Sequence, residues 1–336
     1  MNLNISTEDF KGFWIALAIS GILSFPIMKL LEMMKSKQTV SQFAPEGHQI
    51  KQGTPTMGGI IILAGVLGAM PFIEWHGSLW SGSIFPMAIL ITLFAIIGFV
   101  DDYVVPKLMP GKRGLGWKQK ILMQVVAAAV PLWLAGHGSP MMLAFGVFII
   151  LFFANAFNFS DGLDGLAGTL LLGLLAGMIG ITGIITRGGE ANMNPVMFLF
   201  FGAVLPFLFW NAPKAKVFMG DVGSLPIGAF LGGFWFLCTP EQAQKDLHLN
   251  SFTPTQFGTP IYLALGVWSL MMVAELVPVP IQIASVKLRK KKIFPYTPIH
   301  HAFEKAGWPE TRVVFVFSLL QLIFSMLAIT IVAFVK

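Results

Sequence analysis

Ten apolar runs, each near the length needed to cross a lipid bilayer, constrain this chain more than any other feature. A bilayer core needs about 20 apolar residues per helix. Backbone groups in lipid must be hydrogen-bonded within their own segment, so the runs are predicted to be helices. They cover residues 10–31, 57–73, 84–100, 121–136, 140–157, 166–186, 195–210, 223–238, 260–284 and 312–335. We therefore expect an all-α integral membrane protein, with residues 1–336 forming a single membrane domain.

Composition agrees with this class. The chain is 55% hydrophobic and 11% charged, whereas soluble domains carry about 25% charged residues. The net charge of +6 would suit a nucleic-acid ligand, but Lys and Arg lie between the apolar runs, which favours membrane topology and no nucleic acid. The single cysteine, Cys238, excludes an internal disulfide and gives no metal cluster. The acidic first ten residues do not predict a cleavable signal peptide.

The basic residues predict the orientation of the chain. Ten spans place both termini on one side of the membrane. The odd-numbered connections and adjacent helix ends hold 18 of the Lys and Arg residues, and the other side holds only Lys11, Arg187, Lys245 and Lys336. By the positive-inside rule, the basic connections are cytoplasmic and both termini face outward. The ninth run contains Glu275, Pro278 and Pro280 and is expected to be bent.

The unusual residues fall on the cytoplasmic connections. These connections contain "KQGTPTMGG" (51–59), "FVDDYVVPK" (99–107), "NFSDGLDGLAG" (158–168), "VFMGDVGS" (217–224) and "PIHHAFEKAGWPE" (298–310). They bring five aspartates and two histidines to one face of the membrane: Asp101, Asp102, Asp161, Asp164, Asp221, His300 and His301. Taken singly, each motif has a structural explanation, such as a helix cap or, for "KLRKKK", a topology signal or an anionic-lipid contact.

Together, these residues favour Mg²⁺ and phosphate chemistry. Mg²⁺ prefers carboxylate, phosphate and water oxygens, and glycine turns allow the backbone to approach phosphate closely. Lys51, Lys107, Lys118 and Lys120 are candidates for neutralising a diphosphate. The sequence contains neither a P-loop nor a dinucleotide-binding motif. A phosphate site on a chain with little soluble mass predicts one water-soluble and one lipid substrate, with the lipid entering beside the bent ninth span.

The motifs "GTPTMGG", "NFSDGLDGLAG", "VFMGDVGSLPIG" and "PIHHAFEKAGWPE", in this order, resemble those of bacterial phospho-N-acetylmuramoyl-pentapeptide transferases. The resemblance covers nearly the whole chain. It implies a ten-helix fold in the bacterial cytoplasmic membrane with a cytoplasmic active site, and it allows a homodimer. The implied reaction transfers phospho-MurNAc-pentapeptide from UDP-MurNAc-pentapeptide to undecaprenyl phosphate, which gives UMP and lipid I for peptidoglycan.

The resemblance also implies roles for individual residues. Asp221 is the expected Mg²⁺ ligand, and Asp101 of the Asp101–Asp102 pair is our choice for deprotonating or orienting the lipid phosphate. The expected catalytic set is Asp101, Asp102, Lys120, Asp161, His300 and His301. The expected substrate-binding set, in which Phe218 would stack on uracil, is Lys51, Thr56, Asn158, Gly162, Leu163, Asp164, Asn211 and Phe218.

Two positions depart from the family pattern. The usual third histidine is Ala302, which puts catalysis or substrate preference in doubt. In the ninth run Pro278 replaces a serine and Pro280 is added, whereas Glu275 and Gln282 are kept. Neither change removes a carboxylate, so the expected activity stands.

Two mechanisms fit these residues: direct attack of the lipid phosphate, which we favour, and a covalent aspartyl intermediate. The nearest alternative function is a GlcNAc-1-phosphate transferase of the same superfamily, which would share the aspartates. A secondary transporter would carry charges near the membrane midplane within inverted repeats, and we find no repeat. A scaffold would not need five aspartates on one face.

Overall fold

A computed structural model describes residues 7–34, 53–73, 84–136, 139–185, 194–237 and 254–334, and this part of the chain contains helices and no β-strand. The helices, in chain order, are α1 (Thr7–Met34), α2 (Gly59–Ala69) with the short η2 (Met70–Phe72), α3 (Ile84–Phe99), η3 (Val100–Val104), α4 (Val105–Leu108), α5 (Trp117–Leu134), α6 (Pro140–Ser160), α7 (Leu166–Ile185), α8 (Asn194–Asn211), α9 (Asp221–Leu237), α11 (Pro254–Trp268), α12 (Leu270–Leu276), α13 (Pro278–Arg289), α14 (Ile299–Lys305) and α15 (Glu310–Phe334).

Each apolar run predicted from the sequence lies on one or more of these helices. Six helical stretches are long and apolar enough to cross a membrane: Thr7–Met34, Phe85–Leu108, Pro140–Ser160, Leu166–Ile185, Leu270–Arg289 and Glu310–Phe334. Shorter apolar helices cover Gly59–Phe72, Pro195–Asn211 and Asp221–Leu237. The predicted class, an all-α protein with several membrane-spanning helices, is confirmed.

Close contacts between glycines bring the site-forming helices together. A Cβ added to Gly59 of α2 would lie 2.2 Å from the Cα of Gly223 in α9. A Cβ on Gly98 of α3 would lie 2.3 Å from the carbonyl oxygen of Asp221. Small residues allow helix backbones to approach closely where the bilayer supplies no hydrophobic driving force. These contacts fix the start of α9 between α2 and α3.

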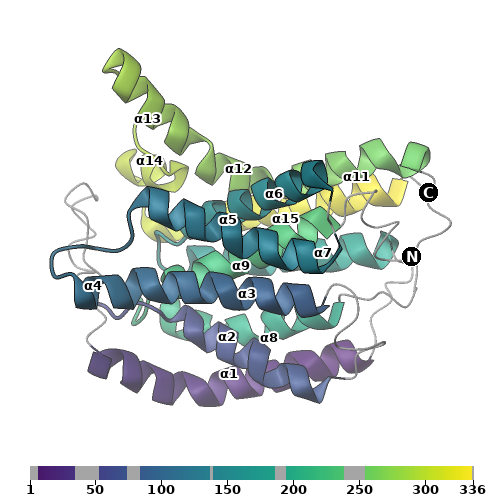
Figure 1. Cartoon of the computed structure of the whole chain (residues 1–336), viewed down its shortest axis with the longest axis horizontal. Helices are drawn as coiled ribbons and strands as arrows, with labels where there is room; N and C mark the ends of the chain where they lie inside the picture. The colour runs from purple at the N-terminus through teal and green to yellow at the C-terminus, as the bar shows by residue number, and fades with distance from the viewer. Residues whose placement is uncertain are drawn as a thin grey trace.

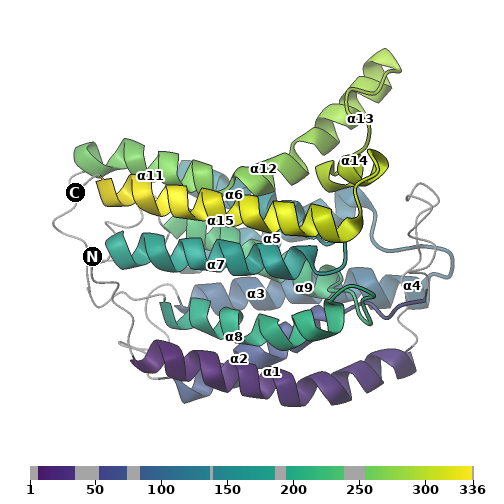
Figure 2. The same ribbon diagram turned by 180° about the vertical axis from the view of Figure 1, so that it is seen from behind.

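The ninth apolar run, which the prolines predicted to be bent, divides into α11, α12 and α13. The break between α12 and α13 falls at Val277, immediately before Pro278, which has no backbone N–H to donate. A second break, at Ser269, was not predicted. The Leu265 carbonyl there accepts from both the Ser269 hydroxyl at 2.6 Å and the Ser269 N–H at 3.1 Å, an arrangement that often bends helices. In both ribbon views α13 leaves the bundle, with α14 beside it (Figures 1 and 2).

The two ends of the bundle differ in content. The start of α1 and the end of α15 lie at the same end (Figures 1 and 2). The opposite end holds α4 and α14, together with the start of α5 and the loop before α9 (Figures 1 and 2). The motifs that the sequence predicted to be cytoplasmic therefore gather at one end of the helices, away from the start of α1 and the end of α15.

Candidate active site

Three carboxylates from distant parts of the sequence form the centre of the site. Asp101 and Asp102 lie on η3, a π-helical turn that follows α3, and Asp221 is the first residue of α9. One carboxylate oxygen from each lies within 4.8 Å of the others. Asp102 Oδ2 also accepts a 3.1 Å hydrogen bond from the backbone N–H of Val222, which joins η3 to the start of α9. Single π-turns within helices are frequent at functional sites because they redirect side chains.

Lys120 lies between two of these carboxylates. Its ammonium donates to Asp101 Oδ2 at 3.3 Å and also forms a short contact with Asp221 Oδ2. Burial alone would lower the pKa of Lys120, but the carboxylates of Asp221 and Asp101 raise it by more than burial lowers it. The pKa of Lys120 is therefore above its ordinary value. The ammonium therefore stays charged at neutral pH. Asp101 is held from its other side by the backbone N–H of Leu115, at 2.6 Å from Oδ1.

Asn158 holds the third carboxylate from α6. Its side-chain Nδ2 donates to Asp221 Oδ1 at 2.6 Å and to Ser224 Oγ at 2.8 Å. Ser224 in turn donates to the Gly220 carbonyl at 2.9 Å. The last turn of α6 and the first turn of α9 are thus joined at Asp221, the metal ligand predicted from the sequence.

The turn that follows α6, residues 161–165, presents its two aspartates to different partners. Asp161 Oδ2 accepts from the backbone N–H of Gly220 at 3.0 Å, next to Asp221. Asp164 Oδ2 accepts from the N–H of Ala215 at 3.0 Å, and the N–H of Asp164 donates to Glu310 Oε1 at 2.6 Å. Asp161 therefore belongs to the acidic centre, whereas Asp164 ties the turn to the loop after α8.

Asn211 and Leu163 support this turn from inside the protein. Asn211 is buried at the end of α8, where its Oδ1 accepts from the Gly165 N–H at 2.9 Å and its Nδ2 donates to the Val217 carbonyl at 2.8 Å. Leu163 is buried in the core. Gly165 has a φ of +82°, a left-handed conformation that glycine adopts without a Cβ clash. In this structure Asn211 links two loops and does not line the cavity described next.

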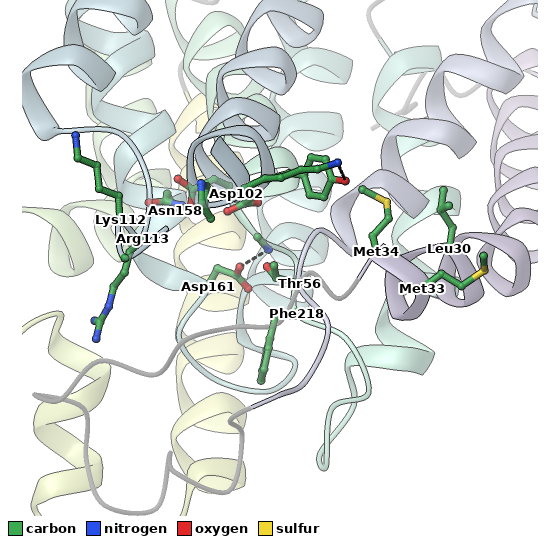
Figure 3. A pocket seen from close by; sticks show the side chains of 16 residues that line it. Leu30, Met33, Met34, Thr56, Asp102, Lys112, Arg113, Asn158, Asp161 and Phe218 are labelled. Atoms are coloured by element: carbon green, nitrogen blue, oxygen red, sulfur yellow. Dashed lines mark hydrogen bonds between the residues drawn. The ribbon is translucent and has the colours of Figure 1, made fainter. Parts of the chain in front are cut away.

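A cavity of about 1210 Å³ opens beside the carboxylates. Seven residues named from the sequence line it: Thr56, Asp102, Lys107, Asn158, Asp161, Phe218 and Asp221. Figure 3 shows Phe218 below Thr56 and Asp161, while Leu30, Met33 and Met34 of α1 form an apolar wall across the opening. The lining of the cavity therefore combines carboxylates, the aromatic ring of Phe218 and apolar side chains of α1.

Sequence reasoning missed two basic residues of this cavity, Lys112 and Arg113 (Figure 3). Their signal was the glycine-flanked "GKRG" between η3 and α5. Of the lysines named from the sequence, Lys107 lines the cavity and donates to the Tyr103 hydroxyl at 2.8 Å. Lys118 lies over the ring of Trp117, 5.6 Å from its centroid, and is not among the lining residues. The predicted Lys51 lies outside the described residues.

The acidic centre fits a divalent cation. Three carboxylates gather there, and Lys120 is the only cationic partner within salt-bridge distance of them among the described residues. With all three carboxylates ionised, one ammonium would leave an excess of negative charge in a half-buried site, and a divalent cation would offset it. Asp221, Asp101 and Asp102 are the oxygen ligands that Mg²⁺ prefers.

The two histidines on α14 lie in different environments. His300 has no exposed surface, and its Nδ1 lies 2.8 Å from Oε2 of the equally buried Glu275. The half-buried His301 pairs through Nδ1 with Glu304 Oε2 at 2.6 Å. Burial and the Glu304 carboxylate raise the pKa of Tyr296, whose ring meets that of His301 edge-on. Neither histidine is among the residues that line the cavity.

Comparison with known proteins agrees with this architecture. The model of glycosyl transferase family 4 matches residues 84–239, which include η3, the 161–165 turn and Asp221. This match and the apolar helices indicate a membrane protein similar to the glycosyl transferases of family 4. A signature described as phospho-N-acetylmuramoyl-pentapeptide-transferase signature 1 matches residues 51–63, the segment that contains Thr56.

Full-length relatives define the family more closely. A phospho-N-acetylmuramoyl-pentapeptide-transferase of Wolbachia sp. subsp. Drosophila simulans is 35% identical over 345 residues, covering 93% of this chain and 95% of the relative. A protein of the same name from Halalkalibacterium halodurans is 33% identical, over 94% of this chain and 94% of its own length. Another, from Fusobacterium nucleatum, is 32% identical, over 97% of this chain and 93% of its own length. The chain belongs to the phospho-N-acetylmuramoyl-pentapeptide transferase family, as the motifs predicted.

Proposed function

We propose that the protein transfers phospho-MurNAc-pentapeptide from UDP-MurNAc-pentapeptide to undecaprenyl phosphate, giving UMP and lipid I for peptidoglycan synthesis. The observation that carries this proposal is the convergence of Asp101, Asp102, Asp161 and Asp221 beside one cavity in a chain of this family. The transferred phospho-N-acetylmuramoyl-pentapeptide is the group in the relatives' names, whereas the UDP donor and the undecaprenyl phosphate acceptor are what the motif resemblance implies.

We propose that ten helices cross the bacterial cytoplasmic membrane, with both termini outside and the active site at the cytoplasmic face. The charge distribution supports this orientation, because the basic connections lie on the side that carries the site motifs. The position of α4 and α14 at the end of the bundle opposite the termini is in keeping with it (Figures 1 and 2).

Asp221, with Asp101 and Asp102, is proposed to hold Mg²⁺. When bound there, Mg²⁺ would neutralise charge on the diphosphate and on the leaving UMP. Asn158 and Lys120 would fix the carboxylate of Asp221 through the hydrogen bond and the ion pair described above. Lys112 and Arg113, at the cavity wall, would attract the anionic substrates and offset their mutual repulsion.

The reaction that we favour is a direct displacement. An oxygen of the lipid phosphate attacks the β-phosphorus of the nucleotide sugar, the bond from that phosphorus to the bridging oxygen breaks, and the electron pair leaves with UMP. Asp101 is proposed to orient or deprotonate the attacking phosphate, with Asp102 exposed to the cavity beside it. Phosphoryl transfer depends mainly on positioning and electrostatic stabilisation, so a covalent aspartyl step is not needed.

The nucleotide and the lipid are proposed to reach this centre from different directions. Phe218 would stack on uracil in the cavity, next to Thr56 and the 161–165 turn. The lipid would approach along α13, which leaves the bundle at Pro278 and exposes the apolar side chains of Ile281 and Ile283. His301 and Glu304 on α14, near α13, are candidates for contacts with the sugar or peptide.

One assay tests the proposal against its nearest alternative. The purified protein is incubated with undecaprenyl phosphate and either UDP-MurNAc-pentapeptide or UDP-GlcNAc, with and without Mg²⁺, and UMP release is measured. We expect UMP only from the muramoyl substrate and only with Mg²⁺. Release from UDP-GlcNAc alone would assign the chain to the GlcNAc-1-phosphate branch. Absence of UMP in every condition would exclude both transferase activities.

A further inference from the structure

A fully buried carboxylate–imidazole pair lies behind the active site. Glu275 is the second-last residue of α12, and His300 is the second residue of α14. Their side chains have no exposed surface, and the Glu275 Oε2 to His300 Nδ1 distance is 2.8 Å. Burying two titratable groups is unfavourable unless good hydrogen-bond geometry between them compensates. Such a pair joins α12 firmly to α14, and it fixes the orientation of the imidazole ring as a carboxylate does in catalytic triads.

The other nitrogen of the His300 ring faces the 161–165 turn. A Cβ added to Gly162 would lie 2.5 Å from His300 Nε2 and 3.0 Å from Cε1, so only glycine fits between the ring and the backbone here. Among the described residues, His300 Nε2 has no hydrogen-bond partner. The ring therefore contacts the turn directly, on a side of the turn that does not line the cavity.

Gly162 adjoins the residue through which the turn reaches the acidic centre. Asp161, its neighbour, lines the cavity and accepts the Gly220 N–H next to Asp221. On the far side of the turn, Asp164 and Gly165 are anchored to Ala215 and Asn211. The turn is thus held at both ends by hydrogen bonds and is contacted in the middle by His300. A shift of Gly162 would displace its neighbour Asp161, which accepts the Gly220 N–H.

We propose that Glu275 and His300 form a positioning pair that fixes the 161–165 turn for nucleotide binding, and that His300 does not act on the reacting atoms. This inference rests on the proposed function. It assigns a role to Glu275, the acid of the broken ninth helix, and it explains why a histidine of the α14 motif is wholly buried. Preorganised sites depend on such supporting contacts, because small displacements of binding groups reduce affinity and rate.

The test measures UDP affinity and turnover for Glu275→Ala, His300→Ala and the double variant in detergent. We expect each single variant to weaken UDP binding about tenfold, with a fall in kcat at saturating substrate no larger than this, because the turn also carries Asp161 of the acidic centre. The double variant should be no weaker than the poorer single variant, because both residues act through one contact. Ser20→Ala removes a buried hydroxyl on α1 that bonds the Ala203 carbonyl at 2.8 Å, and serves as the matched control.

Two results would overturn the positioning role. One is unchanged UDP affinity with a large fall in kcat for His300→Ala, which would place the imidazole on the reacting groups. The other is additive losses in the double variant. Wild-type UMP release, measured in parallel, reports separately on the proposed function, because its absence would refute the transferase activity whatever the variants do.

A second comparison applies if removal of Glu275 prevents folding. Gly162→Ala is made in the wild-type and in the His300→Ala background. The added methyl should weaken UDP binding strongly when the imidazole is present and much less when it is absent, because the smaller side chain leaves room for it. An equal loss in both backgrounds would show that the contact between His300 and Gly162 does not govern nucleotide binding.

Discussion

The side-chain amide of Asn158 donates a 2.6 Å hydrogen bond to the carboxylate of Asp221, across 63 positions of the sequence. This bond joins the end of α6 to the start of α9. The second partner of the amide, Ser224, lies one turn further along α9. The geometry leaves the orientation of the Asp221 carboxylate little freedom, as expected for a group that must hold a cation.

Asp221→Ala should abolish Mg²⁺-dependent turnover. Changes to groups that merely support a metal ligand cost about 10–100-fold, so loss of the ligand itself should reduce UMP release by about 100-fold or more. The measurement is UMP release across a Mg²⁺ titration, with the unfolding temperature recorded to confirm that the variant folds. Near-normal rates would show that Asp221 is not the metal ligand.

Lys120→Met should make the protein more dependent on Mg²⁺ for its stability. Without the ammonium, the carboxylates of Asp101 and Asp221 repel one another, so the unfolding temperature without Mg²⁺ should fall. A cation that binds only the folded state stabilises it by mass action, and the rise in unfolding temperature on adding Mg²⁺ should exceed that of wild type. Lys118→Met, on the exposed side of the same helix turn, is the matched control. An equal rise in unfolding temperature on adding Mg²⁺ to wild type and to Lys120→Met would show that Lys120 and Mg²⁺ do not neutralise the same carboxylates.

The sequence predicted the helices better than it predicted the contacts between them. The apolar runs located the apolar helices of the described residues, because lipid exposure imposes a continuous hydrophobic pattern. Pro278 indicated the bend before α13. The convergence of Asp101, Asp102 and Asp221 was predicted because the charge pattern assigned their motifs to one face of the membrane. The bond from Asp164 to Glu310 and the burial of His300 behind Gly162 depend on long-range packing, which no local pattern encodes.

Phe218→Ala should weaken nucleotide binding. Stacking of a base on an aromatic ring contributes about 1–3 kcal/mol, so the Kd for UDP should rise by about 5- to 150-fold. Phe218→Tyr keeps the ring and should stay close to wild type. Because Phe218 is also largely buried, Phe218→Leu separates packing from stacking. Wild-type affinity in Phe218→Leu would show that the ring does not stack on uracil.

Cysteine labelling should reveal the orientation of the chain. Cys238 is the only cysteine, so Cys238→Ser gives a cysteine-free background. In right-side-out vesicles, a membrane-impermeant maleimide should label Thr7→Cys at the start of α1, and should label Lys112→Cys, at the cavity, only after permeabilisation. Labelling of Lys112→Cys in intact vesicles would place the active site on the outer face and reverse the proposed topology.

Gly59→Ala should destabilise the helix contact on which the acidic centre is built. The added Cβ would lie 2.2 Å from the Cα of Gly223, so α2 and α9 must separate, and overpacking of this kind costs about 1–3 kcal/mol. Since α9 carries Asp221 at its first residue, turnover should fall together with the unfolding temperature. Gly266→Ala in α11 is the matched control, because no atom lies within 4 Å of its added Cβ and alanine is favoured over glycine in a helix by about 1 kcal/mol. A Gly59→Ala variant as stable as Gly266→Ala would mean that α2 and α9 do not pack at this distance, and that Asp221 is placed by other contacts.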